Sequence, residues 1–165
     1  MILIFSLLSG CGNSLLGEQL YDDGYYNVHN TDISESVINF MSRHCDKCCR
    51  LKWSTMDCRH LDAFDDDHFD VVLEKATIEC FFTAERSRWA VSESTMLNVQ
   101  LVANEITRVL KKKTSSYGHF FSISFTAPHF RKTLFDRVFN GDSQNKLKVV
   151  DVLTLGEHFH FFLYH

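Results

Sequence analysis

Residues 9–14, with the sequence SGCGNS, follow an apolar run over residues 2–8. The two glycines, Gly10 and Gly12, would let a ligand come close to the backbone of this turn. A helix that begins after the turn would point free N–H groups at the ligand. A tight strand-to-helix turn without a ligand also favours glycine, so the turn alone is a weak signal of a binding site.

Two aspartates support a ligand site beside this turn. Asp32 ends the next predicted strand about twenty residues after Gly10, where an acidic side chain can accept the hydroxyl protons of a ribose. Asp57 ends the third predicted strand, where its carboxylate can accept a hydrogen bond from an adenine amino group. Each aspartate alone could equally be a helix cap or a turn residue. Together, at consecutive strand ends, they outline an adenosine site.

The spacing of the glycines in this turn discriminates between the common ligands that contain adenosine. A dinucleotide site has the pattern Gly-x-Gly-x-x-Gly around a pyrophosphate, and Leu15 occupies the place of the third glycine here. No Gly-Lys-Ser or Gly-Lys-Thr follows a predicted strand, which argues against a phosphate-binding P-loop. The common adenosyl ligand that remains for a doubly wound α/β fold, which the order of the predicted strands and helices indicates below, is S-adenosyl-L-methionine. An oxidoreductase is a distant alternative.

Four segments resemble a known family: GCGNSLLGEQLYDDGYYNVHNTDISESVI, MDCRHLDAFDDDHFDVVLEKATIECFF, NEITRVLKKK and FSISFTAPHFR. They are similar to class I S-adenosylmethionine-dependent methyltransferases, in the branch that contains the eukaryotic elongation factor 1A lysine methyltransferases. The resemblance covers nearly the whole chain. It implies a protein-lysine N-methyltransferase with S-adenosyl-L-methionine as cofactor and a protein substrate such as elongation factor 1A.

The resemblance also implies roles for individual residues. The glycine turn would pass beside the methionine part of the cofactor, Asp32 would bind the ribose and Asp57 the adenine edge. The implied cofactor-binding residues are Gly10, Cys11, Gly12, Asn13, Asp32, Ile33, Asp57, Cys58, Glu74 and Lys75. The implied catalytic residues, beside the sulfonium where the acceptor enters, are Glu74, Lys75 and Glu79.

The chain departs from the family pattern in four places, the first of which is Leu8, where an acidic residue is often found two places before the first glycine. Lys75-Ala76-Thr77-Ile78-Glu79 stands where the family usually has Lys-Gly-Thr-Leu-Asp, and KKKTSSYG replaces a Pro-Gly-Gly before the fifth strand. The chain also starts directly at the first strand, so we expect it to lack the usual N-terminal helix or lid. These departures leave open a catalytically weak or inactive binding module. A small-molecule methyltransferase is a third possibility.

Strand and helix patterns alternate along the chain and must position these residues. Apolar or alternating runs predict strands at residues 2–8, 26–32, 50–57, 69–75, 118–126, 146–155 and 158–165. Caps and helical spacing predict helices at residues 13–21, from Ser34 past Met41, 92–110 and 128–139, and residues 58–68 read as a polar connection. The predicted fold is α/β: a doubly wound, Rossmann-like, seven-stranded and mostly parallel sheet with a C-terminal antiparallel hairpin strand. Residues 1–165 would form one methyltransferase domain.

Composition excludes several classes of protein. A net charge of −4 without a basic stripe predicts no direct contact with nucleic acid, and the chain holds no apolar stretch long enough to cross a membrane. The six cysteines do not complete a zinc pattern and suit a reducing, cytoplasmic location. The histidines in HFHFFLYH alternate with phenylalanine as in a sheet strand, so we predict no metal site. A lipoprotein signal is disfavoured because no positive charge precedes the apolar run, and we expect a monomer.

Overall fold

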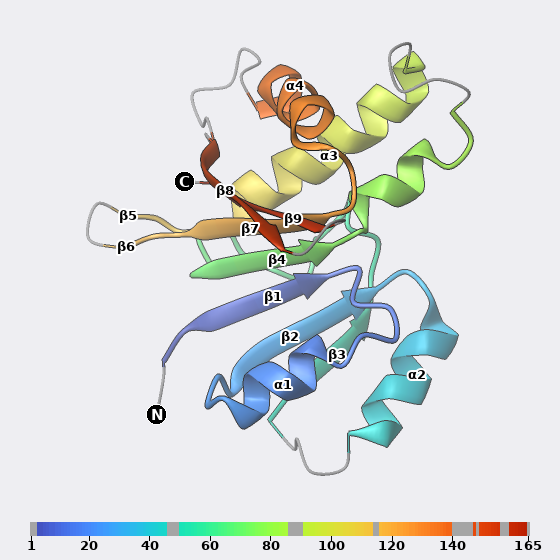
Figure 1. Ribbon diagram of the computed structural model, residues 1–165. Coiled ribbons are helices and arrows are strands. Elements are labelled where there is room, and N and C mark those ends of the chain that lie inside the picture. The colour runs from blue at the N-terminus through green and yellow to red at the C-terminus, as the bar shows by residue number, and fades with distance from the viewer. Residues whose placement is uncertain are drawn as a thin grey trace.

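The structure, a computed structural model, describes residues 3–45, 50–85, 91–113, 116–139, 147, 149–155 and 159–164. Strands and helices alternate through most of the chain (Figure 1). The strands are β1 (Phe5–Ser9), β2 (Asn27–Asp32), β3 (Lys52–Thr55), β4 (Val71–Lys75), β5 (Lys112–Lys113), β6 (Ser116–Tyr117), β7 (His119–Ser124), β8 (Val149–Leu155) and β9 (Phe159–Tyr164). The helices are α1 (Leu16–Asp22), α2 (Glu35–His44), the 3-10 helix η1 (Ile78–Phe82), α3 (Glu93–Val109) and α4 (Pro128–Phe139).

Seven of the strands form one sheet in the order β3-β2-β1-β4-β7-β9-β8. Strands β3, β2, β1, β4 and β7 pair in parallel, whereas β9 is antiparallel to both β7 and β8. The predicted doubly wound sheet with a C-terminal antiparallel hairpin is therefore confirmed. The carboxyl ends of β1 to β4 meet at one edge of the sheet, where such folds bind ligands.

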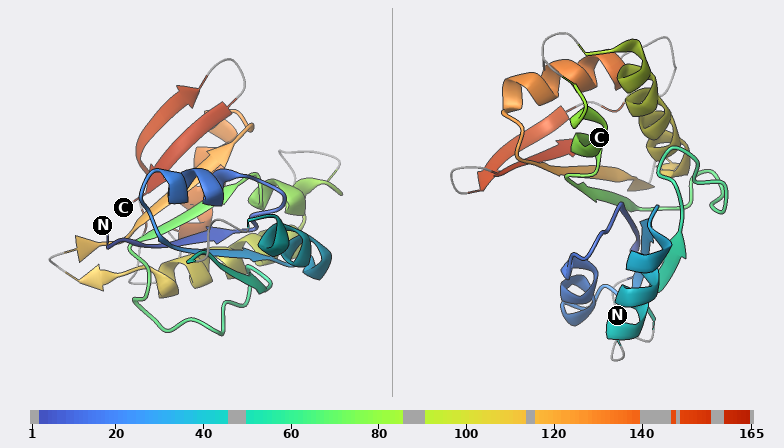
Figure 2. Two further views of the ribbon diagram at one scale, coloured as in Figure 1. Left: turned by 90° about the horizontal axis from the view of Figure 1, so that it is seen from below. Right: turned by 90° about the vertical axis from the view of Figure 1, so that its right-hand side faces the viewer.

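Helices cover both faces of the sheet. Helices α3 and α4 lie against one face, and α1 and α2 lie against the other (Figures 1 and 2). Successive residues of a strand point to opposite faces, so Leu7 of β1 packs into the core beneath α3 and α4, and Leu8 packs with Ile38 of α2. Continuous apolar strands such as β1 are expected where both faces of a parallel sheet are covered.

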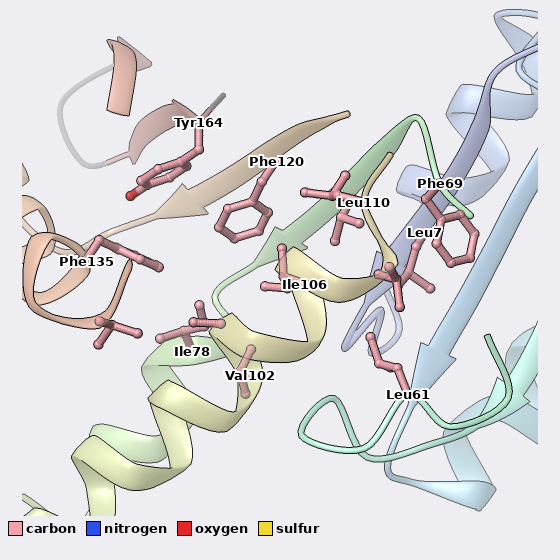
Figure 3. Close-up of a cluster of buried hydrophobic side chains, with 14 of the residues drawn as sticks. Leu7, Leu61, Phe69, Ile78, Val102, Ile106, Leu110, Phe120, Phe135 and Tyr164 are labelled. Carbon is pink, nitrogen blue, oxygen red and sulfur yellow. The ribbon is translucent and has the colours of Figure 1, made fainter. Parts of the chain in front are cut away.

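The larger core lies between the sheet and helices α3 and α4 (Figure 3). Val102 and Ile106 of α3 face Phe120 of β7, and all three side chains are 2% exposed or less. Ser92 caps α3 by accepting a hydrogen bond from the N–H of Thr95, as Ser34 caps α2 through Val37. The predicted cap at Ser34 is thus confirmed, and α3 lies within the predicted range of residues 92–110.

Three local predictions differ from the structure. The connection over residues 58–68 is not simply polar, because Leu61 and Phe64 are buried and Arg108 of α3 binds the backbone oxygens of both. Helix α1 begins at Leu16, later than predicted, without a side-chain cap on Leu15. The lysine-rich segment continues into the short antiparallel pair of β5 and β6 after α3 ends.

Replacing Ile106 by alanine tests this core. The side chain is fully buried between α3 and β7, so Ile106→Ala is expected to lower the free energy of unfolding by about 2–5 kcal/mol. Urea denaturation followed by circular dichroism measures the loss. Leu97→Ala on the same helix is the control, since Leu97 is 61% exposed and its loss should cost less than about 0.5 kcal/mol. Equal losses in the two variants would contradict the packing described here.

Candidate functional site

The glycine turn after β1 adopts a backbone that glycine favours. Gly10 has φ +67° and Gly12 has φ +53°, both in the left-handed region. A Cβ added to Gly10 would lie 2.3 Å from Oγ1 of Thr77, so this position has no room for a side chain. A Cβ on Gly12 would meet nothing within 4 Å, which leaves open space beside this part of the turn.

Asp32 lies at the end of β2 and holds the glycine turn. Its Oδ2 accepts a hydrogen bond from the N–H of Gly12 at 2.8 Å, and its Oδ1 accepts one from the N–H of Ser34 at 2.9 Å. The N–H of Cys11 donates to the carbonyl of Thr31 at 2.8 Å, which ties the turn to the same strand end. The structure therefore brings the first predicted aspartate and the glycine turn together.

Asp57 follows β3, two residues after its last residue Thr55, and is paired with a neighbouring arginine. The guanidinium of Arg59 forms a salt bridge with its carboxylate, and this interaction holds the pKa of the Asp57 carboxyl below its usual range. The same guanidinium donates to Oδ1 of Asn98 at 2.8 Å. Burial raises the pKa of the adjacent Cys58 thiol to about 12. Ile33, at the neighbouring strand end, is 67% exposed.

Glu74 at the end of β4 is buried and fully engaged. Its Oε1 accepts hydrogen bonds from Ser122 on β7 and from the guanidinium of Arg131 on α4. Its Oε2 accepts from the N–H of Thr77 at 2.9 Å and from the N–H of Ile78 at 3.3 Å. Burial raises the pKa of the Glu74 carboxyl, and the charge of Arg131 opposes that shift. Glu74 therefore shapes the turn after β4 from inside the protein.

The Glu74 carboxylate is linked to the glycine turn through Thr77. The Thr77 hydroxyl donates to the carbonyl oxygens of Ser9 at 3.0 Å and Gly10 at 3.2 Å. A chain of contacts thus runs from Arg131 on α4 through Glu74 and Thr77 to the turn after β1. Gly10, Cys11, Glu74 and Lys75 accordingly line one small surface cavity, among other residues.

Glu79 lies on the other side of Arg131. Its Oε1 is 3.2 Å from Nη1 of Arg131 and accepts a hydrogen bond from Ser124. Its Oε2 is buried and has no hydrogen-bond partner among the described residues. Lys75, in contrast to both glutamates, is exposed at the edge of the sheet.

The sequence did not reveal Arg131 or Thr77 as members of the site. Arg131, Phe135 and Val138 share the buried side of α4, and an arginine on such a side indicates a buried acidic partner. That signal was present in the segment APHFR. No group of three or more potential metal ligands occurs among the described residues, and His158, His165, Cys48 and Cys49 lie outside them.

The described part of the chain contains no helix that is both long and apolar enough to span a membrane. Among the described residues, Cys11, Cys58 and Cys80 are free thiols. Cys11 and Cys45 are buried, and Cys80 is exposed on η1.

Residues 7–117 match the model of the protein family described as "Methyltransferase domain". EEF1A lysine methyltransferase 4 from Bos taurus is 36% identical over 157 residues, which cover 95% of this chain and 58% of that protein. The eEF1A lysine and N-terminal methyltransferase of Homo sapiens is 38% identical over 128 residues, 76% of this chain and 17% of that protein. The chain thus spans less than two thirds of the length of these relatives.

Solved structures share the fold at low sequence identity. A SAM-dependent methyltransferase from Aquifex aeolicus matches with a TM-score of 0.69 and 12% identity, covering 98% of this chain and 81% of that one. Magnesium protoporphyrin IX methyltransferase from Synechocystis, crystallised with SAM, matches with a TM-score of 0.61 and 11% identity, covering 98% and 69%. At these identities the likeness concerns the arrangement of the sheet and helices.

The Ala76 backbone gives a first test of the site. Ala76 has φ +59°, a conformation that costs an alanine about 1–2 kcal/mol and costs glycine little. Ala76→Gly is therefore expected to raise the free energy of unfolding by about 0.5–1 kcal/mol, after the greater chain entropy of glycine is subtracted. Chemical denaturation measures the gain, with Ala103→Gly in the middle of α3 as a control that should lose stability. A loss in Ala76→Gly would contradict the left-handed turn.

Removing Arg131 tests the buried charge cluster. Arg131→Met would leave the buried carboxylate of Glu74 without its counter-charge, so the free energy of unfolding is expected to fall by about 3–5 kcal/mol. Lys132→Met, at the next and exposed position of α4, is the control and should change stability by less than about 0.5 kcal/mol. Urea denaturation compares the two. A small effect of Arg131→Met would show that the cluster is not needed for stability.

Proposed function

Because this chain belongs to the methyltransferase domain family, we propose that it is an S-adenosylmethionine-dependent protein-lysine N-methyltransferase that acts on a translation elongation factor. The observation that carries the proposal is the turn after β1, where Gly10 and Gly12 are left-handed and Asp32 accepts the N–H of Gly12, at the carboxyl ends of the strands where such folds bind ligands. The relatives named as elongation factor 1A lysine methyltransferases support the choice of substrate.

The cofactor would lie across the carboxyl ends of β1 to β4. A ligand could lie against Gly12, where an added Cβ would meet nothing within 4 Å, and against the exposed side chain of Ile33. Lone pairs remain on the Asp32 carboxylate after its two backbone hydrogen bonds, so it can still accept from ribose hydroxyls. The proposed cofactor-binding residues remain Gly10, Cys11, Gly12, Asn13, Asp32, Ile33, Asp57, Cys58, Glu74 and Lys75.

The bound cofactor would supply a sulfonium-activated methyl group for transfer to an amine. The protein must then orient the acceptor, exclude water and accommodate an amine that has lost its proton. Of the proposed catalytic residues, Glu74 would act by shaping the turn after β4, since both of its oxygens are engaged inside the protein. Lys75 would border the entrance, and Glu79 would face the acceptor.

The wider assignments belong to the same proposal. We take residues 1–165 as one methyltransferase domain that works as a monomer in the cytoplasm and does not bind nucleic acid directly. The free thiols of the described residues support a reducing compartment.

A non-catalytic binding module is the second candidate. Ala76 favours it, because a residue with a side chain holds a left-handed conformation at this turn. The family pattern that the sequence resembles usually has glycine at this position. Methyl transfer to a small molecule is a third outcome that the experiments separate.

Cofactor binding is the first test of this function. Isothermal titration with S-adenosyl-L-methionine, and with its demethylated product, is expected to give saturable heat with one site. Asp32→Asn removes a charged acceptor and should weaken binding at least about tenfold. Asp151→Asn is the matched control, because Asp151 is exposed on β8, at the far end of the sheet from β2. No heat with either ligand in a folded sample would refute the enzyme and leave the binding module.

The acceptor is identified by the fate of the methyl group. Incubation of the chain and methyl-labelled cofactor with purified elongation factor 1A should transfer label to lysine, detected by mass spectrometry of the digested protein. Label in small molecules of a lysate, with none in protein, would instead establish the third outcome.

A further inference from the structure

A cavity of about 350 Å³ lies between η1, α3 and α4, apart from the glycine turn. Its volume is within the range of ligand-binding pockets in proteins. The apolar part of its lining includes Phe82, Met96, Phe125, Phe130 and Leu134. None of these residues is in the set proposed to bind the cofactor, so the cavity is a separate space at the same end of the sheet.

The polar wall of the cavity belongs to the buried charge cluster. Glu79 and Arg131 both line it, with exposed fractions of 9% and 2%. Glu74 and Glu79 together place two carboxylates against the single guanidinium of Arg131. With both carboxylates ionised, the cluster would carry one more negative charge than Arg131 balances, whereas burial raises the pKa of the Glu74 carboxyl and favours its neutral form.

One oxygen of this cluster also lacks a hydrogen-bond donor. Oε2 of Glu79 is buried without a partner among the described residues, and leaving a buried acceptor unpaired costs free energy. A ligand that brings a positively charged donor would satisfy the oxygen and balance the charge. The other ionisable residues that line the cavity, His129 and Arg137, are exposed, where solvent and salt screen their charges.

We propose that this cavity binds an alkylammonium side chain, namely the lysine that the protein substrate presents for methylation. The ammonium would donate to Glu79, and the carbon stem would pack against Phe82, Phe125 and Phe130. Aromatic faces attract cations and pack well against methylene groups, which suits both parts of a lysine side chain. The proposal rests on the proposed function for the word substrate, whereas binding of an alkylammonium to the cavity can be tested without it.

The position of the cavity supports this assignment. Arg131 contacts Glu79 at the wall of the cavity and Glu74 beneath the turn after β4. Thr77 links that turn to the glycine turn after β1. The acceptor cavity and the cofactor turn are thus two sides of one buried cluster. Lysine and cofactor would approach each other at the carboxyl ends of β4 and β7.

Met96 provides a natural reporter of binding. The protein is prepared with ¹³C-methyl methionine and titrated with n-butylammonium chloride at neutral pH, while methyl NMR signals are recorded. The Met96 signal is expected to shift saturably, because Met96 lines the cavity. The Met41 signal is the internal control, since Met41 is buried in α2 on the opposite face of the sheet and should not move. In Glu79→Gln the affinity should fall about tenfold.

Neutral n-butanol separates cation binding from simple apolar filling. An equal Met96 shift with butanol, no shift with butylammonium, or equal shifts of Met96 and Met41 would each overturn the proposal. Because Glu79→Gln also alters the buried cluster, a second variant at the wall is needed. Leu134→Trp fills the cavity and should abolish the Met96 response, whereas Leu97→Trp on the exposed side of α3 should retain it.

The same pair of variants connects the cavity to catalysis. Leu134→Trp should retain cofactor binding by titration calorimetry and lose transfer of label to elongation factor 1A, and Leu97→Trp should retain both. Full transfer in Leu134→Trp would overturn the cavity as acceptor site while leaving the proposed function intact. Absence of cofactor binding in the unsubstituted chain would instead refute the proposed function, and the butylammonium titration would still decide the cavity.

Discussion

The buried ion pair between Glu74 and Arg131 is the interaction on which the rest of the site depends. Both side chains are 2% exposed, so each charge has lost its water and must be compensated inside the protein. The compensation comes from different elements: Arg131 on α4, Ser122 on β7 and the backbone of the turn after β4. A helix far along the chain is thereby required for the shape of a turn beside β1.

The same device recurs at the neighbouring strand ends. Asp32 after β2 accepts N–H groups of the glycine turn and of Ser34, much as Glu74 after β4 accepts N–H groups of Thr77 and Ile78. At both places an acidic side chain replaces water as the partner of backbone donors that the strand no longer satisfies. The backbone donors at these strand ends are therefore paired within the chain, and such preorganisation reduces the ordering cost of binding a ligand.

The parts of the fold that depend on local pattern were predictable from the sequence. Ser34 predicted the start of α2 because a serine cap acts within three residues, and helical spacing predicted α3. Continuous apolar strands indicated a sheet covered on both faces. The pairing of Glu74 with Arg131 was not predictable, since 57 residues separate them: the register of β4 against β7 places Ser122 beside Glu74, and α4 brings Arg131 to both. The burial of Leu61 within residues 58–68 was not predictable for a related reason. The composition of this segment is polar, but Arg108 of the distant helix α3 binds the carbonyl oxygen of Leu61 and holds it in the core.

The charge cluster would also influence the protonation of an amine bound in the cavity. A carboxylate favours the protonated form of a bound amine, whereas apolar walls favour the neutral form, and methyl transfer needs the neutral form as nucleophile. Arg131 moderates the first effect, because its guanidinium draws the Glu79 carboxylate and weakens its hold on an ammonium. The pairing of two carboxylates with one arginine thus leaves enough negative charge to attract a lysine. The remaining negative charge is smaller than that of a carboxylate without an arginine partner, so it stabilises the protonated form of the lysine less.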